Sequence, residues 1–251
     1  MVRQQQAQVA RARAPPPDPP PSAEQPEITP FLLFLLSIRL VAGASPVINV
    51  LDHGAAGDGI HDDAQAFGRA WMAVCSTIGW PTLLVPPGKT FLLSEVSFPG
   101  PCPYDITHLQ VEGNIVAPDK LWTSQISTSW ISFTNITALV VDGNGQIDGR
   151  GPVWWDCKKK NKCDNVPSLL GISGCVDFEM RGMKLLNSPG EHLIVDRSKW
   201  VRLKGLNFTS PADSPYTDGI YIVGSHYVEV TGTTIGTGNS LNQDGKLDLA
   251  A

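Results

Sequence analysis

The sequence is poor in charged residues and has no excess of positive charge. Only 17% of its 251 residues are charged, and 19 basic against 24 acidic residues give a net charge of −5. Such a chain has no basic field to attract nucleic acid, so we expect no nucleic-acid partner. With 42% hydrophobic residues it is too apolar to be disordered overall. Scarce charge with many small and β-branched residues favours an all-β, secreted protein.

No hydrophobic run is long enough to predict a membrane span. The longest run starts at Phe31, is about 12 residues long and contains Arg39, whereas a span needs about 20 residues. It ends in Ala42-Gly43-Ala44, which has the small-x-small form of a signal-peptidase site. We interpret residues 31–44 as a signal-peptide-like segment; a buried helix or a short anchor are the alternatives.

Glycine is absent before Gly43, whereas eight of the 21 prolines lie in residues 1–30. This Pro/Gln-rich stretch shows no apolar periodicity and cannot bury enough surface to offset its chain entropy. We expect residues 1–30 to be a disordered extension, and a different kind of sequence to begin near residue 45.

The five cysteines include no Cys-x-x-Cys pair, and no histidine pair accompanies them, so a zinc site has no support. In a secreted chain an odd number leaves one thiol unpaired. Cys157 and Cys163 flank a polar loop and are our first disulfide candidate; Cys75 with Cys102 is the second. Cys175 lies in an apolar segment, which favours a buried thiol.

Two sequons, at Asn135 and Asn207, are candidate glycosylation sites. They are consistent with an exported protein, but they are weak evidence for export because such tripeptides also arise by chance.

Helical periodicity nearly vanishes after residue 105, and a loose repeat of the form apolar-x-Gly-x-x-apolar replaces it. The repeat is centred on Gly182, Gly205 and Gly232, which are 23 and 27 residues apart, with weaker copies at Gly113 and Gly143. A period in the low twenties with glycine turns indicates a stacked solenoid. The stricter pattern of leucine-rich repeats is absent, and a β-sandwich has no phase-locked glycine. We therefore predict an all-β, right-handed parallel β-helix.

One amphipathic helix is expected ahead of the repeat, where it would cover the open end of the solenoid. Asp62-Asp63 can cap it. Its apolar face would carry Phe67, Ala70, Trp71 and Val74.

Several short motifs follow one another in an order typical of plant polygalacturonases. They are Gly57-Asp58-Gly59, Leu84-Val85-Pro86-Pro87-Gly88, Ile147-Asp148-Gly149-Arg150-Gly151 with Trp154-Trp155, Leu186-Asn187-Ser188-Pro189, and Asp213-Ser214-Pro215-Tyr216-Thr217-Asp218-Gly219. Each motif is weak alone, but the ordered set resembles this pectin-degrading glycoside hydrolase family. The resemblance implies a parallel β-helix domain over 45–238, a divergent tail over 239–251, a location in the cell wall, and pectin (polygalacturonan) as partner. We expect a monomer.

The family's reaction is an inverting hydrolysis of α-1,4-galacturonosyl bonds, in which one carboxylic acid protonates the leaving oxygen and another carboxylate activates water. By resemblance, Asp218 matches an aspartate that helps to hold this water; a plain turn aspartate is the alternative. Tyr216, which replaces the family's asparagine, and the adjacent Thr217 are candidate substrate-binding residues. His192 is a further candidate, for which a turn or groove-lining role is favoured over catalysis.

The family's second acidic motif is not recognisable. Where Gly-Asp-Asp-Cys is expected, the chain reads Gly236-Thr237-Gly238-Asn239, and the family's Gly-His-Gly and Arg-x-Lys segments do not occur. We therefore expect a C-terminally truncated chain that does not turn over substrate alone. The alternative is a non-catalytic galacturonan-binding wall protein or a non-functional splice product.

A calcium-dependent pectate lyase would need clustered acidic ligands, which the sequence does not show, so we expect neither a metal nor a cofactor. The lysines at 158–160 and 162 could attract anionic pectin, although such a charge run is usually solvated surface. Trp154 and Trp155 could stack on sugar rings or pack at the base of a loop.

Overall fold

The computed structural model describes residues 45–103, 107–122, 128–163 and 165–238. The predicted extension 1–30, the signal-peptide-like segment 31–44 and the tail 239–251 lie outside these residues.

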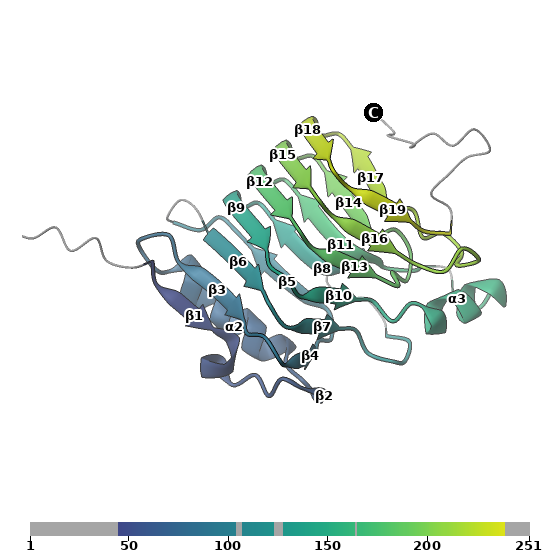
Figure 1. The fold of residues 1–251 in the computed structure, drawn as a ribbon, viewed down its shortest axis with the longest axis horizontal. Coiled ribbons are helices and arrows are strands. Elements are labelled where there is room, and N and C mark those ends of the chain that lie inside the picture. Colours follow the sequence, from purple (N-terminus) through teal and green to yellow (C-terminus); the bar gives the residue numbers. More distant parts are fainter. Residues whose placement is uncertain (1–44, 104–106, 123–127, 164, 239–251) are drawn as a thin grey trace, which may run out of the picture. The chain divides into compact units, whose positions relative to one another are not determined.

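Three parallel sheets wind around a single core (Figure 1), and every strand pairing of the described residues is parallel. Sheet A contains β1 (Val47–Asn49), β3 (Thr82–Val85), β6 (Thr107–Val111), β9 (Thr137–Asp142), β12 (Val176–Arg181), β15 (Lys199–Lys204) and β18 (His226–Thr231). Sheet B contains β2 (Asp58–Asp62), β4 (Thr90–Leu92), β7 (Asn114–Val116), β10 (Gln146–Asp148), β13 (Lys184–Leu186), β16 (Asn207–Thr209) and β19 (Thr234–Gly236). Sheet C contains β5 (Val96–Pro99), β8 (Ser129–Thr134), β11 (Ser168–Ser173), β14 (Leu193–Asp196) and β17 (Ile220–Val223). Since parallel crossovers are right-handed, the predicted right-handed parallel β-helix is confirmed.

The core consists of rows of apolar side chains, each residue lying on its counterpart in the preceding coil. In sheet C, Phe98 pairs with Phe133, which pairs in turn with Ile172. The rings of Phe98 and Phe133 stack with centroids 5.2 Å apart. Because successive side chains of a strand point to opposite faces of the sheet, those that point inward form one such row behind each sheet. Stacking of the coils therefore buries one continuous core.

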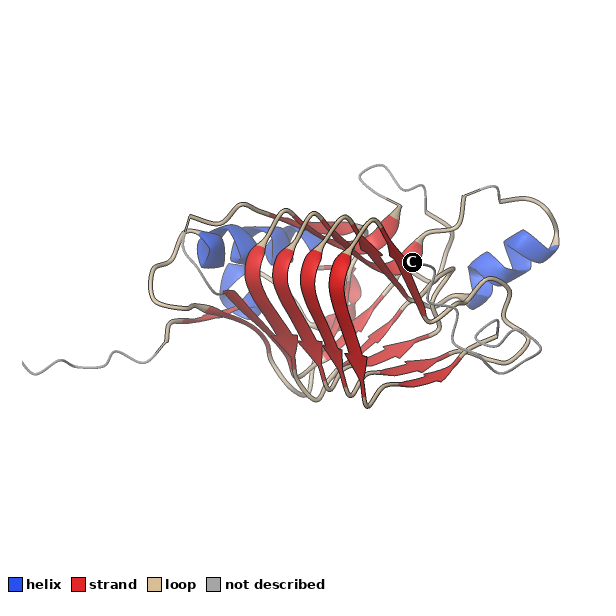
Figure 2. Ribbon diagram, turned by 90° about the horizontal axis from the view of Figure 1, so that it is seen from above, coloured by secondary structure: helices blue, strands red, loops and turns tan. Residues whose placement is uncertain are grey.

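The repeat glycines mark the turn from sheet A to sheet B. Gly182, Gly205 and Gly232 follow β12, β15 and β18, with φ of 69°, 61° and 60°. This left-handed conformation costs glycine little, because it has no Cβ. The predicted role of these glycines is therefore confirmed, and Figure 2 shows the stacked strands joined by short turns.

The turn from sheet C to sheet A has the same length in all coils after the first, in which the connection from β5 to β6 is longer. Two residues separate the strands in each of four coils, and the first of the two is left-handed: Asn135, Gly174, Arg197 and Gly224. The connections from sheet B to sheet C vary in length by contrast, and one of them contains helix α3 (Pro152–Lys159).

The predicted capping helix is α2 (Ala64–Cys75), preceded by the short 3-10 helix η1 (Val50–His53). Its predicted apolar face is buried, and α2 lies against β1, β3 and β5. The cap differs from the prediction in one respect. Asp62 accepts the Ala64 N–H at 3.0 Å, whereas the buried Asp63 carboxylate accepts the N–H groups of Ala56 and Gly57 at 2.6 and 3.1 Å. Asp63 therefore ties the preceding loop to the helix instead of capping it.

Helix α3 was not expected from the sequence, because eight residues give too little periodicity to recognise. Its two tryptophans are buried. Trp155 Nε1 donates to the Ser188 carbonyl at 2.9 Å, and the Trp154 ring contacts the Trp122 ring edge-on at 4.9 Å. Both side chains therefore pack at the base of the loop, and the sugar-stacking alternative is wrong. Among the described residues, no helix has the length and apolar character to cross a membrane.

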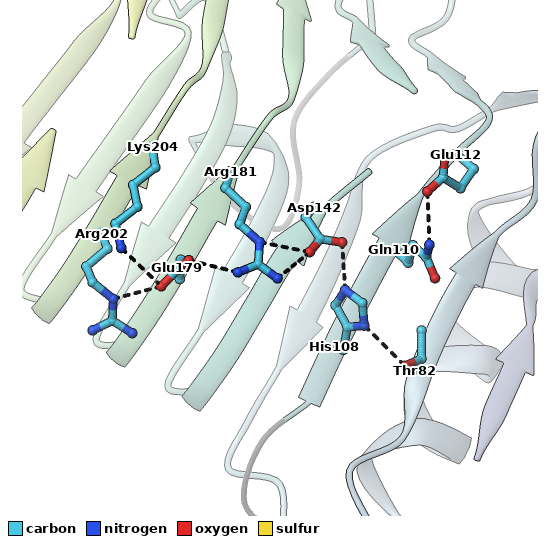
Figure 3. A network of polar contacts seen from close by, with 9 residues as sticks. All are labelled: Thr82, His108, Gln110, Glu112, Asp142, Glu179, Arg181, Arg202 and Lys204. Atoms are coloured by element: carbon cyan, nitrogen blue, oxygen red, sulfur yellow. Dashed lines mark hydrogen bonds and ion pairs between the residues drawn. The ribbon is translucent and has the colours of Figure 1, made fainter. Parts of the chain in front are cut away.

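The outer face of sheet A carries a polar network across several coils (Figure 3). His108 Nε2 lies 2.7 Å from Asp142, and Arg181 contacts both Asp142 at 2.8 Å and Glu179 at 3.2 Å. Arg202 Nε donates to Glu179 at 2.8 Å. The hydrogen bond from Arg202 lowers the pKa of Glu179 below its usual value. Partial burial acts to raise the pKa of Asp142, but its bonds to His108 and Arg181 outweigh this effect and the pKa is lowered.

We expect Glu179→Gln to lower the free energy of unfolding by about 1 kcal/mol at pH 7. A carboxylate with a lowered pKa stabilises the fold when it is ionised, so this contribution is present above about pH 4.5 and is lost as the pH falls through the lowered pKa. Urea unfolding at pH 7 and pH 3 measures the difference. Asp119→Asn, at an exposed position, is the control; a Glu179→Gln effect of equal size at both pH values would contradict the prediction.

Candidate functional site

Asp218 lies in the connection between β16 and β17, two residues before the sheet C strand, and is half-buried. The turn that carries it is held by hydroxyl groups. Thr217 Oγ1 lies 2.6 Å from Ser214 Oγ, which donates to the Pro211 carbonyl at 2.6 Å. The Gly238 N–H donates to Thr217 Oγ1 at 3.0 Å. The turn is therefore fixed from within its own segment and by the segment that follows β19.

His192, from the preceding coil, supports the same turn. Its backbone N–H donates to the Asp218 carbonyl at 2.8 Å, and its ring Nδ1 lies 3.3 Å from that oxygen. Ring Nε2 lies 3.1 Å from Ser210 Oγ, and the ring meets Phe208 edge-on. Burial lowers the pKa of His192 to about 4, so the imidazole is neutral near pH 7.

Two of the predicted substrate-binding residues do not reach the surface. Thr217 and His192 are both 0% exposed, and a polysaccharide lying on the protein cannot touch a fully buried side chain. Direct contact with the substrate is therefore wrong for the Thr217 side chain, whereas His192 has the turn role that the sequence favoured for it. Tyr216, in contrast, is 55% exposed and its backbone is left-handed, with φ of 58°, so it remains available to a ligand.

The C-terminal end of α3 contacts the Asp218 turn. Lys158 Nζ lies 5.1 Å from the centroid of the Tyr216 ring, within the range of a cation–π contact. The neighbouring Lys159 pairs with Asp213 at 3.5 Å. At these two positions the lysines contact protein side chains and are not simply solvated. The spacing of the lysines in the sequence could not predict which residues they contact.

A pocket of about 170 Å³ lies at this junction, and three of its lining side chains are polar: Lys158, Glu191 and Tyr216. Sequence reasoning missed Glu191, which no motif singles out. The signal that could have found it is its place directly before His192, because the stacking of coils brings that segment beside Asp218. Val166, Pro189, Gly190 and Pro215 complete the lining of the pocket.

A second hollow, of about 330 Å³, lies along sheet C, where Ser132, Thr134 and Ser173 contribute hydroxyl groups. Its acidic group is already paired, because Asp196 accepts from Ser173 Oγ at 3.1 Å and contacts Arg197 at 2.7 Å. It offers polar contacts but no uncompensated charge, so the smaller pocket beside Asp218 is the better candidate for recognition of a charged ligand.

The two disulfides join the pairs that the sequence favoured. Cys157 and Cys163 close the loop after α3, with Cα atoms 5.6 Å apart. Cys75 and Cys102 connect the end of α2 to the segment after β5, with Cα atoms 4.9 Å apart. Cys175 is a buried free thiol whose pKa is raised by burial.

Both sequon asparagines, Asn135 and Asn207, are exposed. The hydroxyl of Thr209 donates to the Asn207 side chain at 3.0 Å. Their glycosylation stays a prediction. No group of three or more His, Cys, Asp or Glu side chains is arranged to hold a metal ion within the described ranges.

Comparison with solved structures supports the fold. An endo-xylogalacturonan hydrolase from Aspergillus tubingensis superimposes with a TM-score of 0.65 and 28% identity, over 75% of this chain and 51% of that one. An exopolygalacturonase from Thermotoga maritima gives a TM-score of 0.63 at 21% identity, over 78% of this chain and 54% of that one.

Sequence comparison identifies the family. A probable polygalacturonase from Arabidopsis thaliana is 36% identical over 209 residues, which are 83% of this chain and 45% of that protein. An exopolygalacturonase from Zea mays is 35% identical over 201 residues, covering 79% of this chain and 48% of that protein. The chain thus spans about half the length of the curated relatives it matches. Residues 75–241 match the family described as Glycosyl hydrolases family 28, and the chain therefore belongs to that family, as its resemblance to plant polygalacturonases predicted.

Proposed function

We propose that this chain recognises α-1,4-linked galacturonan, the backbone of pectin, and that Asp218 is one carboxyl group of an inverting polygalacturonase site. The observation that carries the proposal is the buried scaffold around Asp218, in which Thr217 and His192 hold an acidic turn at the start of a sheet C strand. The polygalacturonase names of the plant relatives support the choice of substrate.

We further propose that this chain does not hydrolyse galacturonan on its own. Inversion needs an acid and a base on opposite sides of the bond, about 6.5–9.5 Å apart, and one carboxyl group cannot be both. Thr237 and Gly238 stand where the family pattern has its two further aspartates. A Cβ at Gly238 would overlap the Ser214 carbonyl oxygen, so the turn as folded leaves no room for an aspartate side chain there.

The test is to incubate the purified full chain with polygalacturonic acid and to measure both bound ligand and released reducing ends. We expect saturable binding and no release of reducing ends. Release that Asp218→Asn abolishes would overturn the lack of hydrolysis but support the role of Asp218. Release that Asp218→Asn leaves unchanged would overturn that role, and absence of both binding and release would overturn galacturonan as the substrate.

We also propose that the protein is exported to the cell wall. The two disulfides support this, because such bonds persist in oxidising compartments. Mass spectrometry of isolated cell walls is the test: we expect to find the protein there with glycans on Asn135 and Asn207, and its absence from the wall fraction would contradict export.

A further inference from the structure

Two exposed aromatic rings stack on each other on the outer face of sheet A, away from the Asp218 turn. Trp200 in β15 and Tyr227 in β18 belong to neighbouring, paired strands (Figure 1). Their ring centroids are 4.1 Å apart and the ring planes are inclined by only 7°. Trp200 is 46% exposed and Tyr227 is 64% exposed, although each ring covers one face of the other. The two rings, called the aromatic platform below, therefore keep a surface open to solvent.

A repeated backbone conformation directs these two side chains outward. In β9, β12, β15 and β18 the second residue is left-handed, with φ between 55° and 59°, and the pairing register passes over it. The four residues are Ala138, Asp177, Trp200 and Tyr227. Residues other than glycine adopt this conformation only at a cost in free energy. Such irregularities in a strand re-aim a side chain and are frequent beside functional sites.

Lys199 places a positive charge beside the platform. Its Nζ lies 5.7 Å from the centroid of the Trp200 ring and 5.9 Å from that of the Tyr227 ring. On the same face of sheet A, Arg181, Arg202 and Lys204 are each paired with a carboxylate. Within the residues that the structure describes, Lys199 has no such ion pair. Contact with an aromatic ring holds an ammonium group without neutralising it, so its charge is available to an anion.

The platform and the Asp218 turn lie at opposite ends of β17. Asp218 precedes this strand, whereas Tyr227 follows it, beyond the two-residue turn to sheet A. Trp200 has the same place after β14, one coil earlier. The lining of the pocket beside Asp218 contains neither of these rings. The platform is therefore a surface of its own and not a wall of the candidate active site.

We propose that the platform is a second, non-catalytic site for galacturonan, which holds a uronic acid residue of the polymer outside the Asp218 site. A uronic acid has an apolar ring face next to a carboxylate. The ring face stacks on an aromatic side chain, and the carboxylate pairs with the Lys199 ammonium group. A neutral sugar makes only the first contact. A single cation in a chain of net charge −5 is too little to attract nucleic acid.

This inference rests on the proposed function for the identity of the polymer, and it adds a second place where the chain holds it. Because the two sites are separate, their contributions to binding should be independent. Loss of the platform should therefore weaken binding by the same factor whether or not Asp218 is intact.

The test is electrophoresis of the full chain in native gels that contain polygalacturonic acid, with the neutral polymer β-1,4-galactan as the comparison. We expect retardation by polygalacturonic acid and none by galactan. Trp200→Ala should weaken binding about fivefold, since one stacked ring is lost. Lys199→Gln should weaken it about threefold, as expected for an exposed ion pair. Trp200→Ala should have the same effect in an Asp218→Asn background.

Trp80→Ala is the matched control, because Trp80 is 62% exposed and also left-handed, with φ of 59°, but precedes β3 in the first coil. Lys89→Gln removes one exposed charge elsewhere. Both should stay within twofold of the wild type. Thermal unfolding of each variant confirms that it folds.

Equal weakening by Trp200→Ala and Trp80→Ala would overturn the platform while leaving galacturonan binding, and hence the proposed function, in place. An effect of Trp200→Ala that vanishes in Asp218→Asn would overturn the separation of the two sites. Equal retardation in both gels would overturn a uronic acid as the ligand. A dimer in sedimentation that Trp200→Ala dissociates would assign the rings to self-association instead. No retardation of the wild type would overturn both the platform and galacturonan as the substrate.

Discussion

Lowering the pH from 7 to 4 is expected to reduce the free energy of unfolding by about 3 kcal/mol through His192 alone. The pKa of this buried ring is lowered to about 4 in the folded protein, from 6.5 for an ordinary histidine. Between these values the unfolded chain binds a proton that the folded chain rejects. The stabilising contribution of the neutral ring is thus complete above pH 6.5 and is lost as the pH falls towards 4.

Urea unfolding at intervals between pH 7 and pH 4 measures this loss. In His192→Gln the slope over that range should flatten, even though the variant is less stable at every pH. His226→Gln is the control, because His226 is exposed, and it should keep the wild-type slope. An unchanged slope in His192→Gln would show that the buried imidazole is not the titrating group.

Phe133→Ala is expected to lower the free energy of unfolding by about 3–5 kcal/mol, which corresponds to a fall in Tm of about 10 °C. Phe133 is buried in the sheet C row, stacked on Phe98 and in ring contact with Phe178. Truncation leaves a cavity that neighbouring coils cannot close, because strand pairing fixes their separation at about 4.8 Å.

Calorimetry or urea unfolding of Phe133→Ala checks the size of this loss. Tyr221→Ala is the matched control on the same sheet, because Tyr221 is 46% exposed; we expect it to change stability by less than about 0.5 kcal/mol. Similar losses for the two variants would contradict a continuous core behind sheet C.

The fold could be predicted from the sequence where a backbone requirement selects one residue type. The turn from sheet A to sheet B is left-handed and carries glycine at Gly182, Gly205 and Gly232, so it appears as a repeat. The turn from sheet C to sheet A has the same conformation, but Asn135 and Arg197 adopt it as well. This turn therefore produces no repeat of one residue type in the sequence, although its conformation is the same in each of these coils.

The candidate site could be predicted only as far as motifs reach. Asp218 could be identified because it belongs to an ordered set of motifs. The burial of Thr217 and His192 could not be predicted, since a motif indicates which residues have a role but not whether their side chains are exposed. Lys158 and Glu191 are joined in the pocket by coil stacking and by the fold of α3. The local sequence around either residue therefore does not predict that the two side chains lie close together.

The connections from sheet B to sheet C vary more in length than the two-residue turns that join sheet C to sheet A in four coils, and this has an evolutionary consequence. The strands on either side of these variable connections keep their parallel register, so an insertion at the B-to-C edge lengthens a loop without disturbing any sheet. Ligand preference can therefore change at one edge while the scaffold is inherited intact. Helix α3, with the lysines at its end, lies in one of these long connections, and the same edge is where a designer would graft a new specificity loop.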